Sequence, residues 1–197
     1  EGRFSGDDVI DILLEEPRVA EFITEKLWRE FVSAVPEPGQ VSRLAAAFRN
    51  SGYELRPLMK GLLTTPQFRA TKNRGTMIKS PVDLVIGTMR VLGNPGLDPR
   101  KVASFHRQLG QDLFQPPNVK GWPGGEAWVT TNTLPLRHQF LNRVARGGTM
   151  NVAMPDSGNE GLMEVLLAVA PAVRSTATAR PSKRLALLLL DPAFQLK

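Results

Sequence analysis

The sequence predicts an all-α fold: an irregular multi-helix domain of about eight to nine helices, with one long loop rich in proline, glycine and tryptophan. Apolar residues recur three and four positions apart along most of the chain, which is the period of a helix with one buried face. Serine, aspartate and proline stand where such helices would begin, and glycine where they would end. No segment shows the alternation of apolar and polar residues that indicates a strand.

The first two helices are expected over about the first thirty residues. Ser5 followed by Asp8 fits a capping box, in which the two side chains satisfy free amides at a helix start. Pro17 suits the first position of the second helix, where its missing N–H costs little. Three-to-four spacing then predicts a buried stripe on each helix. The first stripe contains Val9, Ile12 and Leu13, and the second contains Val19, Phe22, Ile23, Leu27 and Phe31.

Two further helices follow. Pro38 opens the third helix, and Gly52 is placed to end it in the left-handed conformation. The fourth is expected over residues 55–63, with Pro57 in its first turn. The buried face of the third helix is expected to contain Val41, Leu44, Ala45 and Phe48.

The second half of the chain has equally clear helix starts. Ser80, Pro81 and Asp83 supply a cap, a first-position proline and a carboxylate for a helix that ends near Gly93. Asp98-Pro99 starts another helix, which Gly110 ends. A long helix is expected over 133–146, and two more over 161–170 and 183–190. The inward residues of the helix over 133–146 would be Leu136, Phe140, Leu141 and Val144.

One short pattern occurs three times, as "LLEEPRV", "LLTTPQF" and "LLLDPAF". Each has a leucine pair, a polar residue, a proline and then an apolar residue. This pattern predicts a helix that stops and restarts at an angle, with the proline as the first residue of the new helix. We interpret these elbows as architecture.

The predicted organisation has three parts. Residues 1–147 form a helical core that includes an aromatic loop at 111–132, and residues 148–160 form a flexible connector. Residues 161–197 form a C-terminal helical pair that packs on the core. At 197 residues and 42% hydrophobic, the chain can bury one ordinary core.

Composition excludes several classes of site. The chain has no cysteine and two histidines, so it offers no thiolate or multi-histidine metal centre, and we expect no metal and no cofactor. No apolar run approaches the roughly 18 residues of a membrane span. The first residues show neither an initiating methionine nor a charged leader. The chain is therefore expected to be a piece of something longer.

The charge is divided unevenly. Residues 1–40 hold ten acids against four bases, whereas residues 41–197 hold nine acids against twenty-one bases. Such a division suggests either two poles that attract each other or an acidic end that contacts a basic partner. The nearest approach to a basic patch is Arg69, Lys72, Arg74 and Lys79, a candidate anion-binding group whose alternative is a solvated basic linker. The bases are otherwise scattered, so nucleic acid is not favoured as a partner.

Four residues are weak catalytic candidates. Asp7, Asp8 and Asp11 could share a helix face and bind a cation or hold a proton at raised pKa. The alternative is that they only favour the positive end of the helix dipole. His106 follows Phe105 on an amphipathic helix, where a lone histidine is more often a core residue than a base.

The stretch "FQPPNVKGWPGGEAW" is the strongest candidate for a ligand-binding site. Its candidate residues are Trp122, Trp128, Asn118 and Lys120. The prolines force extended backbone, Asn118 can shape a turn, and Trp122-Pro123 is a candidate cis bond. Two interpretations stay open. Either the tryptophan rings plug the gap between two helices, or they form an exposed platform for a sugar or a proline-rich peptide.

At these residues the chain resembles a known family. The segments "SGDDVIDILLEEP", "FITEKLWREFVS", "LRPLMKGLLTTPQF", "KSPVDLVIGTMRVLG" and "LGQDLFQPPNVKGWPGGEAWVTTNTLPLRHQFL" are similar, in this order, to the bacterial domain of unknown function 1800 family. The closing "LLLLDPAFQ" resembles its terminal elbow. Members of that family are considerably longer, so the resemblance implies that this chain is a C-terminal portion and that the upstream half docks on it.

The resemblance also implies an exported bacterial protein, periplasmic or extracellular. Genes of this family commonly neighbour one for a sulfatase-like family, domain of unknown function 1501, which is therefore a possible partner. The family has no agreed catalytic residues to transfer. We expect a non-catalytic binding or scaffold module for a partner protein or an envelope polymer such as a glycan. The alternative is part of a cell-envelope hydrolase whose site is shared with the upstream half.

Overall fold

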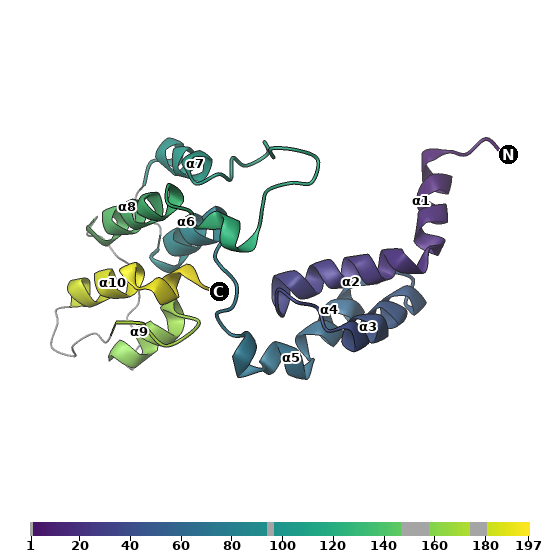
Figure 1. Ribbon diagram of the computed structural model, residues 1–197, viewed down its shortest axis with the longest axis horizontal. Helices are drawn as coiled ribbons and strands as arrows, with labels where there is room; N and C mark the ends of the chain where they lie inside the picture. The colour runs from purple at the N-terminus through teal and green to yellow at the C-terminus, as the bar shows by residue number, and fades with distance from the viewer. Residues whose placement is uncertain (1, 94–96, 147–157, 174–180) are drawn as a thin grey trace. The chain divides into compact units, whose positions relative to one another are not determined.

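The computed structural model describes residues 2–93, 97–146, 158–173 and 181–197 (Figure 1). These ranges contain ten α-helices and three short 3-10 helices. The described residues form no strand and make one isolated antiparallel bridge, between Ile78 and Leu196. The predicted all-α, multi-helix fold is confirmed.

The chain divides into two compact units, Glu1–Thr76 and Met77–Lys197. Each unit has its own cluster of buried apolar side chains. This division falls well before the boundary at 147/148 that the sequence suggests. The predicted connector at 148–160 lies mostly outside the described residues.

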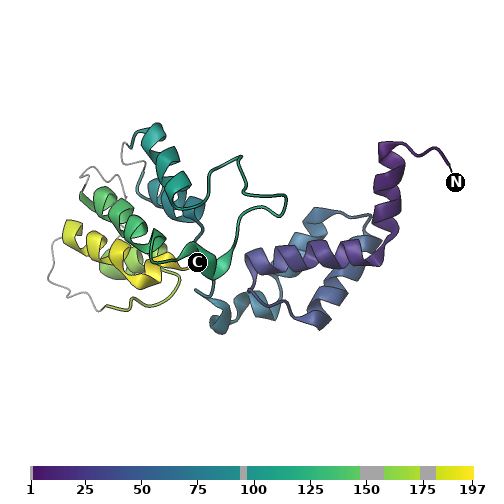
Figure 2. The same ribbon diagram turned by 45° about the horizontal axis from the view of Figure 1, so that its top comes forward.

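The first unit is built around α2, α3 and α4. Trp28 and Leu62 are among its most buried side chains, and the Trp28 indole N–H donates to Ser33 Oγ at 2.9 Å. In both views α2 and α3 lie side by side (Figure 2). The elements are α1 (Gly6–Glu15), α2 (Pro17–Phe31), α3 (Pro38–Asn50), α4 (Leu55–Leu63), α5 (Pro66–Arg69) and η1 (Thr71–Asn73).

The predicted stripe of α2 is confirmed in part, because Ile23 and Leu27 are partly buried and pack against the first core. Ala20, Thr24 and Trp28 are buried, whereas Phe22 and Phe31 are exposed. The fully buried residues recur every four positions and lie next to the partly buried Ile23 and Leu27. The buried face is therefore centred beside the predicted stripe, and the two phenylalanines lie at its exposed edge. The predicted face of α3 is confirmed, because all four of its apolar residues are buried.

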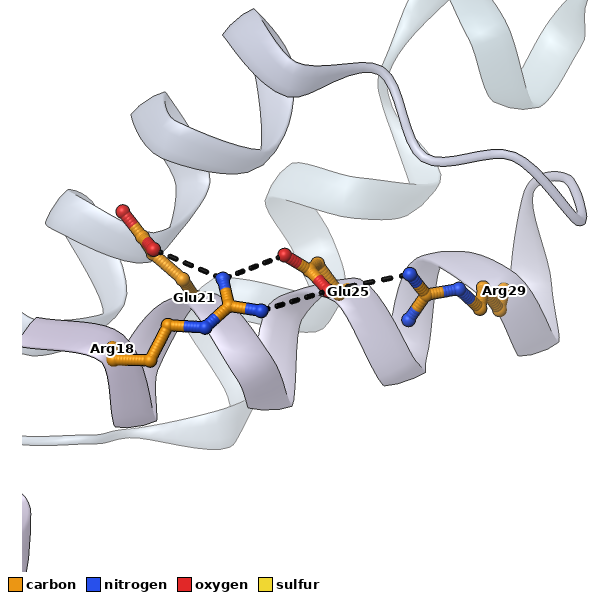
Figure 3. A network of polar contacts seen from close by, with 4 residues as sticks. All are labelled: Arg18, Glu21, Glu25 and Arg29. Atoms are coloured by element: carbon orange, nitrogen blue, oxygen red, sulfur yellow. Dashed lines mark hydrogen bonds and ion pairs between the residues drawn. The ribbon is translucent and has the colours of Figure 1, made fainter.

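The outer face of α2 carries a chain of ion pairs (Figure 3). Arg18 contacts Glu21 at 3.1 Å and Glu25 at 2.8 Å, and Arg29 contacts Glu25 at 3.3 Å. Both arginine side chains are about half exposed or more, and exposed pairs of this kind contribute at most about 1 kcal/mol each. These four charges cancel, so the acidity of this end of the chain comes from other residues, α1 above all.

The second unit is built around α8 and α10, which lie side by side (Figure 2). Phe140, Leu141 and Val144 of α8 are buried as predicted, and Phe105 packs its ring edge-on against Phe140 at 5.4 Å between centroids. The elements are α6 (Pro81–Val91), α7 (Pro99–Gln108), η2 (Gly125–Trp128), α8 (Thr133–Arg146), α9 (Gly158–Leu166), α10 (Pro181–Leu190) and η3 (Pro192–Gln195).

Helix ends follow the predicted signals closely. Ser5 and Ser80 each form a full capping box with the aspartate three residues later. Gly52, at φ +70°, follows α3 in the left-handed conformation as expected. The exception is α9 (Gly158–Leu166), which begins three residues and ends four residues before the predicted range of 161–170.

All three elbows are confirmed as helix restarts. Pro17, Pro66 and Pro192 are each the first residue of a new helix. Thr65 caps the second elbow by accepting from the Phe68 amide at 3.2 Å. Asp191 caps the third elbow and is itself buried. The repeated sequence pattern therefore encodes one local device, which is used in both units.

Candidate functional site

The most unusual surface feature is the segment 111–124 between α7 and η2, which Figure 1 shows as a long extended trace. We call it the exposed loop. The Phe114 side chain is 94% exposed, Val119 is fully exposed, and Leu113 is exposed as well. Phe114 also has φ +66°, a left-handed conformation that bulky residues rarely adopt. An exposed apolar ring on strained backbone needs an explanation other than folding.

The first end of the exposed loop is fixed to the helices beside it. The Gln111 amide donates to the His106 carbonyl at 2.9 Å. The Gln111 side-chain oxygen accepts from the Val82 amide at 3.0 Å. Asp112 pairs with Arg107 at 2.8 Å. These contacts hold the base of the loop while leaving its apolar side chains in water.

The middle of the loop contains the predicted asparagine turn. Asn118 Oδ1 accepts from the Lys120 amide at 2.8 Å, and the Asn118 carbonyl accepts from the Gly121 amide at 3.0 Å. The side chains of Asn118 and Lys120 are both exposed. Asn118 therefore shapes the loop, and Lys120 adds a solvated positive charge to it.

The two tryptophans of this region have different environments. Trp128 is 6% exposed, and its carbonyl accepts from Thr133 Oγ1 at 3.0 Å. Its ring therefore fills a gap, as the plug interpretation expects. Trp122 is partly exposed and stays accessible. The described residues contain no cis peptide bond, so the expectation of a cis Trp122-Pro123 bond is wrong.

The acidic candidates belong to α1 in the first unit. Asp8 Oδ2 accepts from the Ser5 amide at 2.7 Å and from the Ser5 hydroxyl at 2.8 Å. These hydrogen bonds lower the pKa of Asp8, which favours a permanent carboxylate over a proton carrier. Asp7 and Asp11 are exposed. The arrangement matches the alternative interpretation, in which the acids cap the start of the helix and interact favourably with its dipole.

No residue of α1 is buried. The helix is amphipathic as expected, but its predicted apolar face of Val9, Ile12 and Leu13 is exposed to solvent. The neighbouring Ile10 is exposed as well. The C-terminal end of the helix is attached to the unit: the Tyr53 hydroxyl donates to the Leu14 carbonyl. Helix α1 is therefore held at one end and presents an unpaired apolar face.

His106 belongs to the second unit and is buried, at 3% exposure. Burial lowers its pKa, and its Nε2 has no hydrogen-bond partner among the described residues. It therefore behaves as a neutral core residue. Within the described part of the chain, no three His, Asp or Glu side chains are arranged to hold a metal ion.

The predicted basic patch is divided between the units. Arg69, Lys72 and Arg74 are exposed in the first unit. Lys79 belongs to the second unit and is partly buried, with its amine 3.7 Å from the centroid of the Phe194 ring. Burial lowers the pKa of Lys79 to about 8. Lys79 therefore has a different environment from the three solvated bases.

Arg137, which the sequence patterns did not single out, has a completely buried side chain. Arg137 Nη1 donates to Gln195 Oε1 at 2.9 Å, and Nη2 donates to the Lys79 carbonyl at 2.6 Å. The spacing contained the signal. Arg137 precedes Phe140 by three residues and Leu141 by four, which places it on the buried face of α8.

Arg137 joins two segments that are far apart in the sequence. The Lys79 amide donates to the Gln195 carbonyl at 2.8 Å, and the Met77 and Lys197 backbones bond each other in both directions. Lys197 Nζ also pairs with Asp83 at 2.8 Å. The end of the chain is thus fixed to the segment that precedes α6.

Comparisons with known proteins gave one match. A family model described as "Protein of unknown function (DUF1800)" matches residues 1–196. No curated protein and no solved structure matches the chain. Among the described residues, no helix combines the length and the apolar character needed to cross a membrane.

Proposed function

The chain belongs to the DUF1800 family of proteins of unknown function, and from that premise we propose that it is an exported, non-catalytic binding module. Its ligand is an envelope glycan or a sulfatase-like partner protein. The exposed loop is the contact surface. The observation that carries this proposal is the pair of apolar side chains, Phe114 and Val119, that a fixed loop holds in water.

The anchoring of the loop supports a role in binding. A flexible loop would lose conformational freedom when a ligand orders it, whereas a loop fixed at its base loses less. The contacts of Gln111 and Asp112 fix the base, and the Asn118 turn fixes the middle. Rigid aromatic and aliphatic side chains on such a loop are typical of residues that dominate binding energy.

Trp122 offers a direct probe of the loop. The chain has three tryptophans, of which Trp28 and Trp128 are buried. Iodide should therefore quench mainly the Trp122 fluorescence, and Trp122→Phe should remove that quenching. Added muropeptides, which are soluble peptidoglycan fragments, should protect Trp122 from iodide in the wild-type chain.

Phe114→Ala combined with Val119→Ala should abolish this protection. Val35→Ala is a matched control, because Val35 is also an exposed apolar residue but lies in the first unit. If muropeptides give no protection, the same variants are tested for binding to a sulfatase-like protein of the domain of unknown function 1501 family. Failure of both ligands would refute the proposal. Release of soluble products from peptidoglycan would contradict its non-catalytic part.

The open face of α1 supports a second contact. We propose that the upstream half of the protein docks on Val9, Ile10, Ile12 and Leu13, because these side chains would otherwise remain in water. Ile10→Asp should weaken the association between this chain and a separately produced upstream segment. Val35→Asp, at an exposed site outside α1, should leave it unchanged. Equal binding by both variants would exclude α1 as the docking surface.

A further inference from the structure

The surroundings of Arg137 contain two buried donors that no described residue satisfies. They are Arg137 Nε and Gln195 Nε2. Arg137 has no acceptor atoms and can only donate. The side-chain oxygen of Gln195, Oε1, must therefore face it, and the distance from Arg137 Nη1 to this oxygen is 2.9 Å. The Gln195 amide nitrogen is then left without a bond to Arg137. Both donors require an acceptor that the described residues do not provide.

Leaving these two donors without an acceptor is energetically unfavourable. A buried polar group without a hydrogen-bond partner destabilises the folded chain, and a charged group does so more strongly. Arg137 is completely buried and Gln195 is 8% exposed, so bulk water does not solvate them freely. Nε–H and Nη2 lie on the same edge of a guanidinium plane, the edge that binds oxyanions through two parallel bonds. The Lys79 carbonyl occupies Nη2, and Nε remains.

Charge around the same residues is unbalanced. The charge of Asp83 acts on both Lys79 and Arg137, but its Oδ2 already accepts from the Lys197 amine at 2.8 Å and from the Ser80 hydroxyl at 2.8 Å. Among the described residues, no carboxylate lies within ion-pair distance of Lys79 or Arg137. Lys79 instead places its amine against the face of the Phe194 ring. Lys79, Arg137 and Lys197 therefore share one carboxylate, Asp83, and positive charge is in excess in this partly buried region.

We propose that this region binds a small oxyanion, a carboxylate or phosphate group, which accepts from Arg137 Nε and Gln195 Nε2 beside the Lys79 amine. The ligand supplies both the missing acceptors and the missing negative charge. A water molecule could satisfy a donor but would leave the charge unbalanced. Lys79 is partly exposed, so the anion enters from its side. This site is separate from the exposed loop and does not depend on the function proposed for it.

The direct test is a titration of the chain with sodium phosphate and, separately, sodium acetate, at constant ionic strength maintained with sodium chloride. The Arg137 Nε–H resonance should shift in a saturable way with at least one of the two anions. Lys79→Met should weaken that binding by about tenfold, the loss expected for one charge-assisted contact of roughly 1.4 kcal/mol. Lys120→Met, at an exposed lysine, should leave it unchanged.

A second variant protects the test against a failure to fold. Gln195→Glu keeps an oxygen for Arg137 and supplies a carboxylate in the chain itself. It should melt at a higher temperature than the wild type without added anion, and its resonance should no longer respond to phosphate or acetate. The proposal is overturned if the wild-type resonance does not respond, which would indicate water at the site. It is also overturned if Lys79→Met and Lys120→Met respond as the wild type does.

Discussion

At the scale of single residues, Phe114 is the clearest sign of a function beyond folding. Its ring contributes nothing to either core, and its backbone has a left-handed φ that costs an L-residue about 1 kcal/mol or more. Glycine adopts that φ without strain. This combination supports the proposed role of the Phe114 side chain in binding.

Phe114→Gly should therefore separate stability from binding. Relief of the strained φ should leave the chain as stable as before, or more stable by up to about 1 kcal/mol, because the flexibility of glycine in the unfolded chain offsets part of the gain. The free energy of unfolding in urea measures the first effect. Iodide protection of Trp122 by muropeptides measures the second effect, which should be lost. A destabilisation of several kcal/mol would mean that the ring is part of the folded core.

Lys79 should make stability depend on pH in the alkaline range. Burial lowers its pKa to about 8 in the folded chain, against an ordinary value of 10.5. Between these two values the unfolded chain binds more protons than the folded chain, so stability rises with pH across this window and the gain is complete above 10.5. The difference in unfolding free energy between the wild type and Lys79→Met should rise from pH 8 to pH 10.5. A flat difference would contradict the lowered pKa.

At the scale of elements, the elbow before η3 shows how a short motif acquires a tertiary role. Asp191 is buried. Its carboxylate accepts from the Ala172, Val173 and Ala193 amides at 3.0, 2.9 and 2.8 Å. Burial alone would raise the pKa of Asp191, but the three hydrogen bonds outweigh it and the pKa is lowered. One side chain therefore caps the new helix and also holds the segment that follows α9.

Asp191→Ala should destabilise the second unit by about 3 kcal/mol at neutral pH, because three amides lose a charged acceptor. Asp191→Asn tests the charge. Its cost relative to the wild type should be present above the ordinary pKa of 3.8 and should disappear as the pH falls through the lower folded value. Urea unfolding at pH 7 and at pH 3 provides the comparison. A cost that does not change with pH would mean that the carboxylate charge is unimportant.

Trp128 is the corresponding test for the aromatic plug. Removal of a buried tryptophan ring costs about 3–5 kcal/mol, and Trp128 is buried whereas Trp122 is not. Trp128→Ala should therefore lower stability by about 3 kcal/mol, and the partly exposed Trp122→Ala by clearly less. Thermal unfolding followed by circular dichroism measures both. Equal losses of stability in the two variants would mean that the Trp122 ring is also part of a packed core.

At the scale of the whole molecule, the chain contains two apolar cores in place of one. The first core includes Leu44, Phe48 and Leu62, and the second includes Phe140, Leu141 and Leu189. The first is formed by helices that follow one another in sequence, such as α2 and α3, whereas the second also brings together the more distant α8 and α10. Separate cores favour separate unfolding units.

Leu62→Ala should destabilise the first unit selectively. A large-to-small change in a core costs about 2–5 kcal/mol, and Leu62 is completely buried. Hydrogen exchange should accelerate over residues 17–63 and stay unchanged over residues 81–146. Leu141→Ala, at an equally buried site in the second unit, should give the reverse pattern. Acceleration across both units from either variant would show that the chain unfolds as one cooperative body.

Local signals in the sequence carried most of the fold. The capping boxes of Ser5 and Ser80, the restarts at Pro17 and Pro192, and the left-handed Gly52 lie where the sequence predicts them. Each depends on contacts between residues fewer than five positions apart, so the sequence by itself determines them. The family follows in the same way, because ordered motifs along the chain identify it.

Only the tertiary structure decided which surfaces stay open and which polar groups are buried. Periodicity marks an apolar face, but it does not say whether another element covers that face. Neighbouring elements bury the apolar face of α3, whereas no residue of α1 is buried. Periodicity also could not show that Arg137 meets Gln195, because 58 residues separate them. Burial and long-range contacts depend on which segments pack together, and a linear pattern does not contain that information.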